Sequence, residues 1–270
     1  MGETRSVGVT PEAAGGTARA GGAARVAGLA VGLAALAAVV AFQVMSGLSP
    51  EPVRFTGLIV AVLAVSVIGF AAASWGAGRS VAGFGAAVLA GYAAEAVGVR
   101  TGFPFGDYRY TDLLWPQPGG VPVVVALAWG GMGLAAYAVA TAIVPAPGPA
   151  RVAVGALALT AWDLFLDPQM VGLGLWTWAA PGPYRGIPLS NYAGWLLVSA
   201  LVMLLLQRIT GGAARPGRGR GLAGVYTTMA VMETVGFAVV FQPPDPLVAV
   251  AGGISMGAFA ALAWRRLWQR

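Results

Sequence analysis

The sequence has no cysteine, no histidine and no lysine, and all sixteen of its basic residues are arginine. Without cysteine it cannot build a disulfide framework, a thiolate metal site or a cysteine nucleophile. Without histidine it lacks the side chain that most often carries protons near neutral pH. Acid–base catalysis by this chain would therefore depend on Asp, Glu, Tyr or Arg.

Charge is also scarce, since 10% of the 270 residues are charged, against roughly 25% in a soluble domain. Apolar runs of about twenty residues, the length that crosses a bilayer as a helix, recur along the chain. They cover residues 26–45, 55–75, 81–99, 122–144, 152–167, 190–207, 222–241 and 246–264. We therefore predict an all-α fold, a polytopic membrane helix bundle of about eight transmembrane helices, with a single transmembrane domain over residues 24–266.

Residues 1–23 consist mainly of Gly, Ala, Thr and Arg without an apolar period, which predicts a disordered N-terminal tail. The first run is long and no clear small-residue cleavage site follows it, which favours a retained span over a cleaved signal peptide. With the N-terminus inside, twelve arginines fall inside and four outside, as the positive-inside rule requires. We expect both termini to be cytoplasmic in a multi-pass protein of the cell membrane. The net charge of +6 does not indicate nucleic acid, because most arginines flank apolar runs.

The connections at 100–121 and 168–189 are long, and both fall outside in this topology. The first contains "GFPFGDYRYTD" over residues 102–112, which carries two aspartates, an arginine and four aromatic residues. Aromatic residues here, such as Trp115 and Tyr184, also suit the interfacial belt of a membrane protein.

A short repeat relates the two connections. Gly120-Val121-Pro122 precedes Trp129 by the spacing at which Gly186-Ile187-Pro188 precedes Trp195. Each proline is expected in the first turn of a span, where its missing N–H costs nothing. The flanking spans are then two parallel copies of one hairpin, although a match this short also arises by chance.

Three acidic residues, Glu95, Asp163 and Glu233, fall within predicted spans. Ionisable groups there are costly unless they are paired or face water, and they indicate function. Asp163 and Asp167 are four residues apart and share a helix face. Asp167 precedes Pro168, where the helix is expected to end.

The connection adds Asp107 and Asp112 on the same side of the membrane, so six carboxyl groups are expected to converge in the outer leaflet. Clustered titratable groups in an apolar cavity are typical of an active site. The alternative is that these acids pair with Arg100, Arg109 and Arg185 and only tie the connections to the helices.

The sequence lacks the motifs of several classes of enzyme chemistry. There is no Asp-rich diphosphate–magnesium motif, no Walker loop and no dinucleotide fingerprint, and haem would lack its usual ligand. Acid chemistry on an apolar substrate remains. A carboxylic acid could protonate an alkene, aromatic faces could stabilise the carbocation, and a second carboxylate could direct water onto it.

The blocks "GFPFGDYRYTD" and "GVPVVVALAW", then "AWDLFLDPQM", "GLWTW" and "GPYRGIPLSNYAGW", resemble the CruF-type carotenoid biosynthesis proteins, which are integral-membrane carotenoid hydratases. The similarity covers roughly residues 80–200 and is looser elsewhere. It implies addition of water across the terminal double bond of an acyclic carotenoid end group, giving a tertiary alcohol. It implies no cofactor and no metal, and as partners a carotenoid, membrane lipid and other enzymes of carotenoid biosynthesis.

Under this resemblance the proton donor is Asp163 or Asp167, with Glu95 as the other acid. Asn191 is expected to orient the attacking water, or else to act as a helix N-cap. The other candidates are Asp107, Tyr108, Tyr110 and Asp112 at the mouth, Arg109 and Arg185 as partners of carboxylates, Trp162, Trp176, Trp178 and Trp195 beside the polyene or cation, and Glu233.

Two rival interpretations remain open. A prenyl elongase or cyclase would act on the same pigments, but an elongase should show paired Asp-rich motifs. A proton-coupled lipid transporter or scaffold would use the acids as a relay, and inverted repeats with broken helices would favour it.

Overall fold

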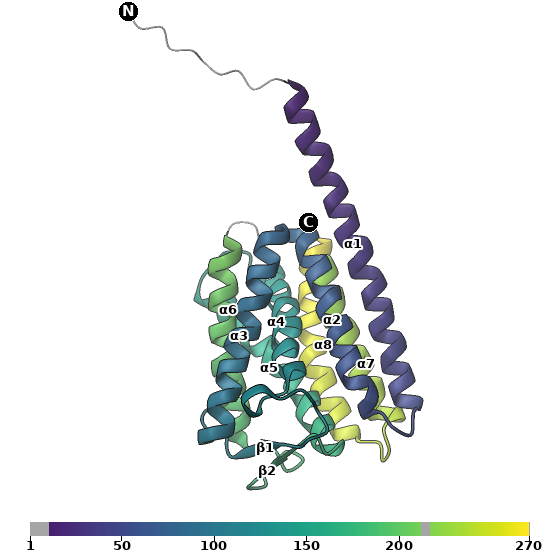
Figure 1. Ribbon diagram of the computed structural model, residues 1–270, viewed down its shortest axis with the longest axis vertical. Helices are drawn as coiled ribbons and strands as arrows, with labels where there is room; N and C mark the ends of the chain where they lie inside the picture. The colour runs from purple at the N-terminus through teal and green to yellow at the C-terminus, as the bar shows by residue number, and fades with distance from the viewer. Residues whose placement is uncertain (1–10, 212–216, 270) are drawn as a thin grey trace, which may run out of the picture.

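Eight helices, each antiparallel to the next along the chain, form the body of the molecule in the computed structural model (Figure 1). The structure describes residues 11–211 and 217–269. They are α1 (Pro11–Leu48), α2 (Val53–Trp75), α3 (Ala77–Thr101), α4 (Val123–Ile143), α5 (Pro149–Gly172), α6 (Leu189–Thr210), α7 (Arg220–Val235) and α8 (Pro246–Trp268). All 8 are long and apolar enough to cross a membrane. The prediction of an all-α bundle with about eight spans is therefore confirmed.

Both described ends of the chain lie at the same end of the bundle (Figure 1), as an even number of spans requires. The membrane side on which they lie stays a prediction. Residues 11–23, expected in a disordered tail, belong to α1, which extends beyond the bundle. Alanine is the strongest helix former, and lengthening an existing helix costs less than starting one. Residues 1–10 lie outside the described residues.

Helix α4 lies at the centre of the bundle, and every residue from Ala128 to Ala142 is buried. Its glycines allow this, because small residues let neighbouring helices approach closely. A Cβ atom on Gly130 would lie 2.7 Å from the Phe84 ring of α3. Glycine therefore sets the distance between α3 and α4, the two helices of the first hairpin.

The two long connections hold short strands that were not predicted, β1 (Tyr108–Tyr110) and β2 (Trp176–Trp178). They pair antiparallel, with Arg109 opposite Thr177. The first connection also holds a 3₁₀ turn, η1 (Pro118–Gly120). The units α3–β1–α4 and α5–β2–α6 thus join through corresponding strands, as expected for two copies of one hairpin.

The prolines of the suspected repeat occupy matching positions. Pro122 is the N-cap of α4 (φ −63°, ψ 133°) and Pro188 the N-cap of α6 (φ −66°, ψ 145°). Each lies just before the first turn rather than inside it. The extended conformation directs the chain from each connection into a helix in the same way.

The prediction that helix α5 ends before Pro168 is wrong, because the helix continues to Gly172. A proline inside a helix lacks the N–H that would bind the carbonyl four residues earlier, here that of Leu164. The Tyr184 hydroxyl donates to this carbonyl at 3.0 Å. Replacing the lost hydrogen bond in this way is how membrane helices tolerate proline, and it keeps Asp167 on a regular helix.

Candidate active site

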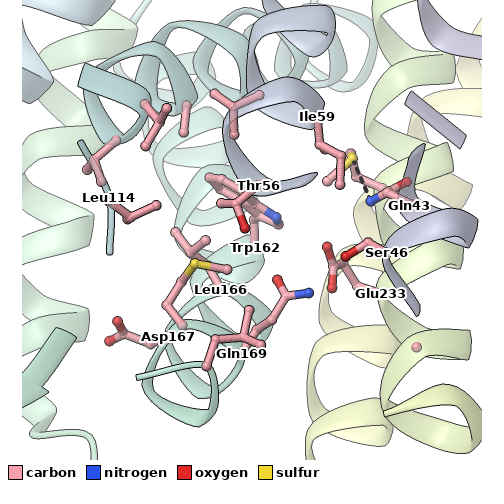
Figure 2. A pocket seen from close by; sticks show the side chains of 18 of the residues that line it. Gln43, Ser46, Thr56, Ile59, Leu114, Trp162, Leu166, Asp167, Gln169 and Glu233 are labelled. Atoms are coloured by element: carbon pink, nitrogen blue, oxygen red, sulfur yellow. Dashed lines mark hydrogen bonds between the residues drawn. The ribbon is translucent and has the colours of Figure 1, made fainter. Parts of the chain in front are cut away.

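A cavity of about 240 Å³ lies at the end of the bundle that carries β1 and β2. Residues from helices α1 to α7 and from both strands line it. Most of its wall is apolar and aromatic, and its polar groups are few (Figure 2). Such a cavity suits a largely apolar ligand held in place by a small number of polar contacts.

Glu95 of α3 lies at one wall of this cavity and accepts three hydrogen bonds. The Tyr108 hydroxyl and the Tyr110 hydroxyl, the latter at 2.7 Å, donate to its Oε2 atom, and Trp129 Nε1 donates to Oε1 at 3.1 Å. Alternate residues of a strand point to the same face, which directs both tyrosines inward and leaves Arg109 exposed.

The two tyrosines are held as neutral donors. Burial, and then the nearby Glu95 carboxyl, raises the pKa of both Tyr108 and Tyr110 above the usual value of a phenol. A neutral phenol donates one hydrogen bond, and donation to a carboxylate gives the stronger, charge-assisted kind.

Two glycines on the Glu95 face of α3 make room for these donors. A Cβ atom on Gly98 would lie 2.8 Å from the Tyr108 hydroxyl, and one on Gly91 would lie 2.3 Å from the Trp129 ring. Residues 91, 95 and 98 share one helix face by their spacing. The Glu95 site therefore depends on glycine at positions that the sequence analysis did not single out.

Asp163 and Asp167 of α5 lie on one helix face, as predicted, and Asn191 of α6 joins them. Its Nδ2 atom donates to Asp163 Oδ2 at 2.7 Å and also to Asp167 Oδ2. Trp176 Nε1 donates to the other oxygen of Asp167 at 2.9 Å. The three linked residues Asp163, Asp167 and Asn191 are all buried.

The suggestion that Asn191 caps a helix is wrong, because the N-cap of α6 is Pro188. Within this group, Asp167 and Asn191 line the cavity, and Asp163 lies outside its lining. Asp163 Oδ1 is buried and has no hydrogen-bond partner among the described residues. The geometry therefore distinguishes an aspartate facing the cavity from one behind it.

Aromatic rings cover the same wall as the acids. Trp129 and Trp195 are stacked at 4.1 Å between ring centroids, and Trp162 meets the edge of Trp195 at 6.0 Å. Trp178, beside Tyr108 at 5.2 Å, also lines the cavity. Trp129, known from the sequence only as a member of the repeat, is thus a site residue through its contacts with Glu95 and Trp195.

The six acids do not all converge. Asp107 and Asp112 are exposed, as is Arg109. Glu233 of α7 lines the cavity but lies across it from Asp167 (Figure 2). Position along a loop predicts the side of the membrane on which a residue lies, but not the direction of its side chain.

Arginine does not neutralise the buried acids in the described part of the chain. The ion pairs there are Arg54–Glu51 and Arg185–Asp245, the latter at 2.6 Å. Asp245 also accepts from Val248 N and so caps α8. Arg185 therefore ties the second connection to α8, and phenol, indole and amide groups hold Glu95, Asp163 and Asp167 instead.

No group of three or more acidic residues is placed to hold a metal ion within residues 11–211 and 217–269. The polar side chains that line the cavity carry carboxyl groups, phenols, amides, aliphatic hydroxyls and indoles.

The chain is 36% identical over 127 residues to bisanhydrobacterioruberin hydratase of Haloarcula japonica. That match covers 45% of this chain and 43% of the relative, so the chain spans less than half the length of this relative. No solved structure matches. The family model described as "Carotenoid biosynthesis protein" matches residues 55–260, which is most of the chain and includes every acid of the site. The chain therefore belongs to the carotenoid biosynthesis protein family.

Proposed function

We propose that this protein is a carotenoid hydratase, which adds water across the terminal C=C bond of an acyclic carotenoid end group to give a tertiary alcohol. The observation that carries the proposal is a pair of carboxyl groups, Glu95 and Asp167, facing an apolar cavity beside stacked tryptophans. The hydratase among its relatives supports the reaction class.

In the first step, Asp167 protonates the alkene. The O–H bond of the acid breaks, a C–H bond forms at the less substituted carbon, and a tertiary carbocation remains. Two carboxyl groups linked through one amide do not both ionise readily in an apolar environment. The pair Asp163 and Asp167, joined by Asn191, is therefore suited to store the proton, and Asp167 is the member that reaches the cavity.

The carbocation then lies beside the indole rings of Trp162 and Trp195, which line the cavity. The negative faces of aromatic rings attract a cation, most strongly where water is excluded. Carboxylates near the cation lower its energy further. Both contributions act at the step that creates the charge, so they lower the barrier rather than only tightening binding.

In the second step, water attacks the cation and Glu95 accepts the released proton. The hydrogen bonds from Tyr108, Tyr110 and Trp129 orient this carboxylate and hold it ready to act as a base. Return of the proton from Glu95 to Asp167 restores the starting state. The sum is one alkene and one water giving one alcohol, so no oxidant or cofactor is needed.

We further propose that both termini face the cytoplasm in the cell membrane, which places the cavity in the outer half of the bilayer. The support is the excess of arginine at the end of the bundle that carries the termini. A position beside lipid allows a long polyene to stay in the membrane while one end enters the cavity.

Co-expression in a host that accumulates acyclic or monocyclic carotenes tests the function. Mass spectrometry of the pigments should show a gain of one water per modified end. Asp167→Asn should abolish this gain, and the exposed Asp112→Asn should retain it. Unchanged pigments across several substrates, with the folded protein in the membrane, would reject the hydratase and favour a transporter or scaffold.

A further inference from the structure

A second polar group lines the cavity on the α1 and α7 side, and the mechanism above does not use it. It consists of Gln43 and Ser46 from α1 and Glu233 from α7. Figure 2 shows these three residues on one side of the cavity and Asp167 on the other, with Trp162 and Leu166 between them. Thr56 and Gln169 also lie between the two sides, so the cavity has an acid at each end and a mixed apolar and polar wall between them (Figure 2).

Two acceptor oxygens of the second polar group lack a donor among the described residues, whereas the Ser46 hydroxyl donates to the Pro52 carbonyl at 3.2 Å. Glu233 is 5% exposed, and its Oε2 atom is buried without a hydrogen-bond partner among the described residues. The same is true of Gln43 Oε1. A buried acceptor without a donor is unfavourable, and such groups in native proteins usually bind water or a ligand.

The contacts of Gln43 show which of its amide atoms has no partner among the described residues. Its Nε2 amide nitrogen donates to the Met229 sulfur at 3.7 Å. The Oε1 atom of the same amide accepts no hydrogen bond among the described residues. Gln43 and Glu233 thus present acceptor oxygens, and the group that complements them is an O–H donor.

Local backbone features bring α1 close to this part of α7. The chain after α7 forms a π-helical turn, η3 (Gly236–Val240), whose residues Gly236 and Val240 line the cavity. A Cβ atom on Gly47 would lie 2.7 Å from Val240 Cγ1, so only glycine fits there without a shift. Single turns of π-helix occur frequently at functional sites.

We propose that Gln43, Ser46 and Glu233 form a hydroxyl-binding subsite that accepts an O–H group at the end of the cavity opposite Asp167. The O–H belongs either to an alcohol on the polyene end group or to a water held beside it. In both cases the contact fixes how deeply the end group sits, and thus which double bond meets Asp167. The inference rests on the proposed function for its ligand class, a polyene.

Binding rather than turnover tests the subsite, so its failure is distinct from failure of the hydratase proposal. Quenching of tryptophan fluorescence reports the affinity of the purified protein for two polyenes, one with an alcohol on the end group and one without. The Asp167→Asn variant serves as the background. Gln43→Leu and Glu233→Leu are each compared with Gln169→Leu, which removes an amide of α5 that lines the cavity outside the proposed group of three.

An alcohol-binding subsite predicts that Gln43→Leu and Glu233→Leu each weaken binding of the hydroxylated polyene about tenfold and spare the other. A water-binding subsite predicts equal weakening for both polyenes. Gln169→Leu should leave the affinity for each of the two polyenes at the background value. Affinities within twofold of the background for both polyenes, in variants that elute as folded protein, would overturn the subsite. If binding behaves as expected but no pigment gains water, the hydratase proposal fails and the subsite stands.

Discussion

Trp129 and Trp195 stack at 4.1 Å between ring centroids, at an angle of 19° between their planes. They occupy corresponding positions in the two hairpins, seven residues after the prolines that cap α4 and α6. Trp129 also donates to Glu95 at 3.1 Å. One contact between the two hairpins thus links an acid to the aromatic wall of the cavity.

Removing the amide of Asn191 should impair both stability and activity. Asn191→Leu keeps the approximate volume but takes the shared donor from Asp163 and Asp167. Leaving buried acceptors without a donor should lower the free energy of unfolding by about 2–4 kcal/mol and abolish the gain of water. Thermal unfolding in detergent measures the first effect, with exposed Ser190→Ala as the control. Wild-type stability would contradict the role given to Asn191.

Adding one methyl group to α3 should disturb the Glu95 site. In Gly98→Ala the new Cβ atom would lie 2.8 Å from the Tyr108 hydroxyl, so the phenol must move away from Glu95. We expect at least a tenfold loss of hydratase activity. Gly85→Ala is the matched control in the same helix, because its Cβ atom would meet nothing within 4 Å and should stabilise the helix slightly. Equal activity in both variants would reject the contact.

Replacing the Tyr184 hydroxyl should destabilise α5 near Pro168. Tyr184→Phe removes the donor to the Leu164 carbonyl, at a cost of about 1 kcal/mol. In a Pro168→Ala background the new N–H group can bind that carbonyl itself, so Tyr184→Phe should cost less. A double-mutant cycle of unfolding free energies measures this coupling, and strict additivity would disprove it.

Stability should decrease at alkaline pH because of the two half-buried phenols, Tyr108 and Tyr110. Burial raises the pKa of Tyr108 and Tyr110 in the folded state, while the unfolded value is about 10. Their contribution is therefore complete below pH about 10 and is lost as pH rises above it. Melting temperatures in detergent from neutral to strongly alkaline pH should show this loss.

The variant Tyr110→Phe removes one of these titrating groups. Its melting temperature should fall less steeply between neutral and alkaline pH than that of the wild type. The control is Thr177→Ser, which removes no tyrosine. Thr177 is exposed and lies opposite Arg109 in the strand pair. Parallel pH profiles of Tyr110→Phe and wild type would show that Tyr110 does not titrate in this range.

The positions of the spans and of the acids within them followed from the sequence alone. Hydropathy is a local property, and a bilayer requires about twenty apolar residues for each helix, so each span is readable without its neighbours. For the same reason, the sequence was sufficient to predict that Glu95, Asp163 and Glu233 lie inside helices. The characteristic blocks around Tyr108 and Asn191 were sufficient to indicate the family, which the match over residues 55–260 establishes.

Only the tertiary structure decided which of these groups meet. The alternation of side chains in β1 turns Tyr108 and Tyr110 to Glu95 and leaves Arg109 exposed, although all three are adjacent in sequence. The contacts that decide this join segments far apart in the sequence. They are the pairing of the two strands, the close packing of rings at glycine, and the hydrogen bond that replaces the one lost at Pro168. Because these contacts set the direction of each side chain, they place Asp167 at one end of the cavity and Glu233 at the other.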